Sequence, residues 1–173
     1  MEADMVTTKT TPCGGPLPDL EVPMINTMVA CLGNEHRRLD DLTMQLAFAA
    51  ARLAADPDEV SASQRAVEVW DELQRELWPH LQIEDELVFS WGEAHHAISA
   101  TLLDTLKLER QDMRKLVAAL PALSPGLHHE PQTADDRGAF ARTLLALAQM
   151  LDSHVERHDG EVLPAILRAL FHK

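Results

Sequence analysis

The segments LWPHLQIEDELVF (residues 77–89) and LDSHVERHDGEVL (residues 151–163) repeat one pattern in this chain. Each has a histidine followed four places later by a second side chain that can bind a metal, namely His80 with Glu84 and His154 with His158. Residues four apart share one helix face, and that face is otherwise apolar. Each segment therefore predicts a helix that carries two polar side chains into a buried seam, which is costly unless a metal binds them.

The same helical spacing of apolar residues continues along most of the chain. It predicts helices over about 23–54, 61–91 and 98–120, and a fourth from Thr133 through Val162. The connections are short, and no long stretch alternates as a strand does. We therefore expect an all-α fold, an up-down-up-down four-helix bundle over residues 23–173, behind a flexible tail over residues 1–22.

Three local signals mark the ends of these helices. Ser61 or Ser63 is expected to cap the second helix, and Pro121 is expected to end the third. Thr133 with Asp136 three places on resembles a capping box, which predicts the start of the fourth helix.

Composition restricts the partners and the location. The net charge of −13 argues against nucleic acid or an anionic membrane as a partner, because both attract basic surfaces. Cys13 and Cys31 show no CxxC spacing, and the first twenty residues lack the basic start and apolar core of a signal peptide. These features predict a reducing, cytoplasmic location and no disulfide framework.

The repeat extends to the other two helices. The segment NEHRRLDDL (residues 34–42) aligns with LERQDMRKL (residues 108–116), so the first two helices resemble a copy of the last two. Arg110 then takes the place that His36 holds. Such pseudo-symmetry would gather His36 and the two ligand pairs of the opening segments around one point in the bundle core.

Together these residues resemble the hemerythrins and their bacterial relatives, the HHE cation-binding domains. The resemblance runs from about residue 23 to residue 171, and it is carried by His36, by His80-xxx-Glu84 and by His154-xxx-His158-Asp159. In that family two iron atoms lie between the helices and bind dioxygen, or respond to oxygen, nitric oxide, peroxide or iron level. The resemblance therefore implies non-haem iron, one or two atoms with two favoured.

The resemblance also implies a role for each ligand. His36 and His80 would hold one metal, Glu84 would bridge to the second, and His154 would bind that second metal. Imidazole and carboxylate groups suit iron, and no thiolate lies on the predicted ligand faces to favour a soft metal.

The chain departs from the family pattern in helix three, where Arg110 stands at the expected histidine position and cannot bind a metal. In one alternative, His158 replaces the missing ligand and Asp159 bridges the metals. In a second, Glu109 enters from helix three. A third is a single-metal site, or one in which Arg110 supplies the positive charge of the absent iron.

The resemblance implies a protein that binds or senses dioxygen, nitric oxide or iron status, with metal ions and a small diatomic ligand as partners and a homodimer as a possible assembly. An enzyme that detoxifies peroxide or nitric oxide is the main alternative. A further alternative is a metal-free interaction module in which Glu84 is merely salt-bridged to Arg110.

Overall fold

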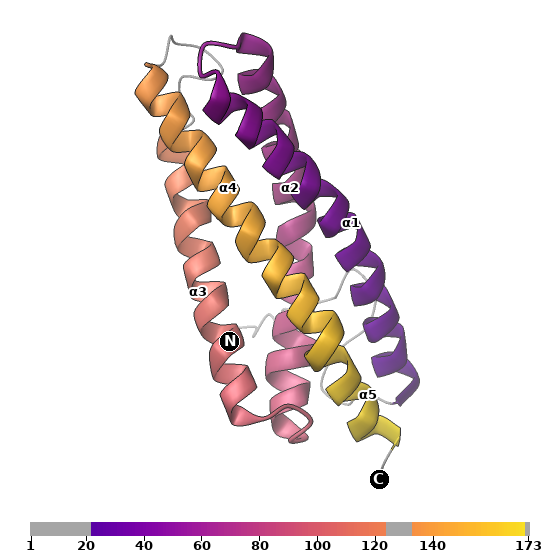
Figure 1. Ribbon diagram of the computed structural model, residues 1–173. Coiled ribbons are helices and arrows are strands. Elements are labelled where there is room, and N and C mark those ends of the chain that lie inside the picture. The colour runs from indigo at the N-terminus through magenta and orange to yellow at the C-terminus, as the bar shows by residue number, and fades with distance from the viewer. Residues whose placement is uncertain (1–21, 124–132, 172–173) are drawn as a thin grey trace, which may run out of the picture.

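The computed structural model describes residues 22–123 and 133–171 and shows long helices packed side by side (Figure 1). The elements are α1 (Val22–Ala55), α2 (Val60–Glu84), the π-helix η1 (Asp85–Gly92), α3 (Ala100–Leu123), α4 (Ala134–Arg157), the π-helix η2 (His158–Val162) and α5 (Leu163–Phe171). The four long helices α1, α2, α3 and α4 run alternately in opposite directions, with α1 packed against α2 and α4, and α3 against α4. The predicted all-α bundle is confirmed, and the described residues contain no strand.

Two of the four columns of the bundle contain a π-helical segment that the sequence did not predict. Helix α2 passes without a break into η1, and α4 passes through η2 into α5. A π-turn holds an extra residue per turn and so shifts the helix faces beyond it, and such turns are frequent at functional sites. Here η1 starts one residue after Glu84, and η2 starts at His158.

A polar layer divides the apolar core into two clusters. One cluster includes Leu39 of α1 and Met113 of α3, and the other includes Leu32 and Leu106 from the same helices. The buried polar residues between them are His36 on α1 and Arg110 on α3, facing His80, Glu84, His154 and His158 from the other two columns. The layer lies at matching depth on every helix, as the internal repeat predicts.

The helix boundaries agree with the sequence in part. The capping box at Thr133 is confirmed, because Asp136 N donates to Thr133 Oγ1 at 3.2 Å and Thr133 N donates to Asp136 Oδ2 at 3.3 Å. The predicted serine cap is wrong: α2 begins at Val60, and Ser61 instead donates to the side chain of Glu59. The prediction that Pro121 ends the third helix is wrong by two residues, because α3 continues to Leu123.

The predicted tail falls outside the described residues, apart from Val22. None of the described helices combines the length and the apolar character needed to cross a membrane.

Thr133→Ala is expected to lower the free energy of unfolding by about 1 kcal/mol, because it leaves the N–H of Asp136 without its cap. For a chain of this size the melting temperature should fall by roughly 2 to 4 °C. Thermal unfolding followed by circular dichroism checks this. Thr105→Ala, inside α3, is the control and should change little; equal melting temperatures for the two variants would contradict the capping role.

Candidate metal centre

Four imidazoles surround the carboxylate of Glu84 in the polar layer. Oε1 of Glu84 lies 3.0 Å from His80 Nε2, 3.0 Å from His154 Nε2 and 3.1 Å from His158 Nδ1. His36 completes the set from α1, with its ring centroid 4.9 Å from that of His80. All five side chains are at most 2% exposed.

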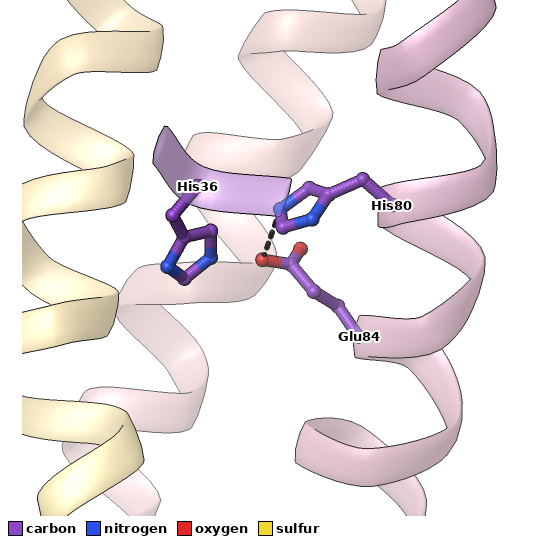
Figure 2. A group of neighbouring side chains, drawn as sticks. All are labelled: His36, His80 and Glu84. Atoms are coloured by element: carbon purple, nitrogen blue, oxygen red, sulfur yellow. Dashed lines mark ion pairs between the residues drawn. The ribbon is translucent and has the colours of Figure 1, made fainter. Parts of the chain in front are cut away.

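The five residues form two groups that share one carboxylate. His36, His80 and Glu84 have ligand atoms within 4.8 Å of one another, and so have Glu84, His154 and His158. Figure 2 shows the first group, in which His80 and Glu84 extend from the same helix toward each other and His36 approaches from α1. Glu84 is the only member of both groups, which is the arrangement that a bridging carboxylate requires.

The hydrogen bonding of these side chains fits a bound cation. His36 Nε2, His80 Nε2, His154 Nδ1 and both nitrogens of His158 are buried and make no hydrogen bond among the described residues, although His80 Nε2 and His158 Nδ1 lie at ion-pair distance from Glu84 Oε1. Buried polar atoms normally have a hydrogen-bond partner, and leaving such an atom without one costs about 1–3 kcal/mol of stability. A cation accepts lone pairs from several imidazoles and a carboxylate at once, whereas one carboxylate oxygen cannot satisfy three rings by hydrogen bonds. Nitrogen and oxygen donors of this kind suit iron.

Two carboxylates behind the centre orient the first group. Asp159 Oδ1 lies 2.5 Å from His36 Nδ1, and Glu35 Oε2 lies 3.2 Å from His80 Nδ1. A neutral imidazole that donates through Nδ1–H to such a carboxylate keeps the lone pair of Nε2 free for a metal. Glu35 was missed by the sequence analysis, because its position one residue before His36 carries no periodic signal.

The other sequence candidates lie outside the two groups. Asp159 contacts the far side of His36 and is half-exposed. Glu109 forms an ion pair with Arg157, whose Nη2 lies 2.9 Å from Glu109 Oε1. His158, by contrast, is fully buried beside His154, in the position from which it would replace the missing helix-three ligand.

Arg110 occupies the helix-three place in the layer. Its Nη1 lies 3.8 Å from Glu84 Oε2, its Nη2 lies 2.9 Å from Asp85 Oδ2, and Nη2 also donates to the carbonyl oxygen of Leu81. The Glu84–Arg110 contact of the metal-free alternative is therefore present. It involves Oε2, however, and leaves Oε1 facing the three histidines.

Burial and neighbouring charges shift the pKa values of groups in the centre, and so set which of them carry a charge. Burial alone would raise the pKa of Glu84, but the surrounding imidazoles, among which His80 carries a positive charge, hold it well below its ordinary value. Burial lowers the pKa of His158 to about 3, so this ring is neutral. Burial also opposes charge on His80, yet the carboxylates of Glu84 and Glu35 outweigh it and raise the pKa of His80 to about 9. A metal that binds His80 Nε2 must therefore displace a proton.

Asp159→Ala is expected to weaken metal binding by about 10- to 100-fold at one of the two groups, because His36 loses the carboxylate that fixes its tautomer. Calorimetric titration of metal-free protein with Co²⁺ measures the effect. Asp152→Ala, an exposed change of the same charge on α4, is the matched control. Equal affinities for the two variants would show that Asp159 does not orient His36.

The comparisons with known proteins agree with this geometry. The family model described as hemerythrin HHE cation binding domain matches residues 27–166, a span that contains all five buried ligand candidates. Comparison with curated proteins and with solved structures gave no significant match. Since the family model covers well over half of the chain, the protein belongs to the hemerythrin HHE cation-binding domain family.

Proposed function

We propose that the protein holds non-haem iron, two atoms per chain, and uses it to bind or sense dioxygen, nitric oxide or iron status. The observation that carries the proposal is the shared carboxylate: Glu84 belongs to both groups of buried ligands. His36 and His80 would complete the first site. His154 and His158 would complete the second.

The residues of the chain would prepare the centre for an ion and a small ligand. Iron, once bound, supplies reversible coordination of a diatomic molecule and one-electron chemistry. Glu84 provides the negative charge, and Asp159 and Glu35 hold two imidazoles in the required tautomer. Leu32, Leu77, Leu106, Met113 and Leu151 are fully buried above and below the layer and would keep bulk water away. Such exclusion strengthens the electrostatic interactions inside the site.

Metal analysis with an optical spectrum tests the proposal. Protein produced without a histidine tag in iron-supplemented medium is expected to contain about two iron atoms per chain, as a di-iron bundle does. Its spectrum should change when dioxygen or nitric oxide is admitted and should return when the gas is removed. Steady consumption of peroxide or nitric oxide would favour the enzyme alternative. Iron-free protein with an unchanged spectrum would contradict both and favour the metal-free module.

A cytoplasmic location and a homodimer remain predictions.

A further inference from the structure

A pocket of about 350 Å³ lies between α3 and the first part of η1. It is lined by Asp85, Phe89, Lys107, Arg110, Gln111 and Arg114. Three cationic side chains line the pocket with one carboxylate, Asp85, on a chain whose net charge is −13. Glu93 contacts Lys107 and Glu84 contacts Arg110 from outside this lining, whereas Arg114 forms no ion pair among the described residues. The three cations come from α3 at spacings of three and four residues, which places them on one helix face.

Some hydrogen-bond donors of this pocket have no good acceptor among the described residues. Arg110 Nε is buried and has no hydrogen-bond partner among residues 22–123 and 133–171. Within the part of the chain that the structure describes, Lys107 Nζ forms an ion pair with Glu93 alone, at 3.5 Å. Asp85 is engaged by Arg110 Nη2 at 2.9 Å, so its charge is opposed by the same guanidinium that lines the pocket. A buried guanidinium N–H without an acceptor costs free energy, which an anion in the pocket would recover.

We propose that this pocket binds a small anion that carries a phosphate group. Guanidinium groups match phosphate oxygens with paired N–H donors, and a phosphate offers several acceptor oxygens at once, to Arg114 and to the Arg110 Nε that lacks an acceptor. The Arg110 guanidinium also lies 5.4 Å from the ring centroid of Phe89, so one wall is aromatic. A pocket of this volume accepts a small molecule, and a phosphate monoester would fill it better than free phosphate.

The pocket and the candidate metal centre share Arg110. Its Nη1 lies 3.8 Å from Glu84 Oε2, so its positive charge opposes a cation bound at Glu84. An anion that neutralises Arg110 should therefore tighten cation binding, and by linkage the cation should tighten anion binding by the same factor. This coupling rests on the proposed metal site, whereas anion binding does not.

Titration of metal-free, full-length protein with inorganic phosphate and with phenyl phosphate tests the pocket. Both probes are expected to bind, and Arg114→Ala should weaken them by about 10-fold or more, the value of one charged hydrogen bond. Lys115→Ala makes the same charge change next to Arg114 but outside the pocket, and should bind as the unaltered protein does. Tighter binding of phenyl phosphate would identify a monoester; equal binding would identify free phosphate. Absence of binding, or equal losses in the two variants, would overturn the proposal.

A second titration with Co²⁺ tests the coupling. Saturating phenyl phosphate should tighten Co²⁺ binding by about 5-fold or more, and Arg114→Ala should abolish this gain. Unchanged Co²⁺ affinity in protein that binds the anion would overturn the coupling. Failure to bind Co²⁺ under any condition would contradict the proposed metal function and the coupling together, while the phosphate titration still decides whether the pocket binds an anion.

Discussion

Glu84→Gln is expected to remove both metal ions at once. The substitution keeps the size of the side chain but removes the one negative charge that the two ligand groups share. Loss of residues that merely orient ligands costs 10- to 100-fold in affinity, so loss of a shared ligand should cost about 100-fold or more. Metal content by mass spectrometry, after dialysis against metal-free buffer, should fall from about two ions per chain to nearly none.

Two further variants separate a shared ligand from a general loss of structure. Glu72→Gln is an exposed change on the same helix and should retain the full metal content. His154→Ala removes a member of one group only and should leave close to half of the metal, bound by His36, His80 and Glu84. If Glu84→Gln retained as much metal as His154→Ala, the bridging role would be wrong.

The same substitution should destabilise the metal-free protein. Glu84 is fully buried between His80, whose raised pKa gives it a positive charge, and Arg110. Removing one partner of a buried charge cluster leaves the others uncompensated, at a cost of about 3–5 kcal/mol. Circular dichroism spectra therefore accompany each metal analysis, so that an unfolded variant is not taken for a folded one without metal.

Stripping the metal is expected to lower the melting temperature by roughly 5 to 10 °C. A ligand that binds only the folded state, at a hundred times its dissociation constant, adds about 2.7 kcal/mol to the free energy of unfolding. In a chain of 173 residues each kcal/mol corresponds to about 2 to 4 °C. Calorimetric scans before and after chelation measure the shift, and added Fe²⁺ or Co²⁺ should restore it.

The restoration experiment also distinguishes the proposed centre from a metal-free module. In Glu84→Gln the melting temperature should no longer respond to chelator or to added metal, whereas Glu72→Gln should respond as the unaltered chain does. A melting temperature that ignores metal in the unaltered chain would favour the structural Glu84–Arg110 contact as the reason for the buried polar layer.

The linear pattern of residues was enough to predict the bundle and the pairing of candidate ligands along each helix. His80 and Glu84, or His154 and His158, share a face because α-helical geometry places residues four apart side by side, whatever the rest of the fold does. The capping box at Thr133 is likewise a local matter, since its two hydrogen bonds join residues three apart. Such features depend on short-range geometry, so a linear pattern reveals them.

The contacts around those candidate ligands depend on how the helices pack against one another. Glu35 and Asp159 lie behind His80 and His36, Glu109 turns to Arg157, and Arg110 joins the pocket to Glu84. Each of these contacts joins residues at least 26 positions apart in the chain, and each depends on how the helices rotate and slide against one another. The π-turns after Glu84 and at His158 shift the helix faces there, and no periodic rule for an α-helix foresees them.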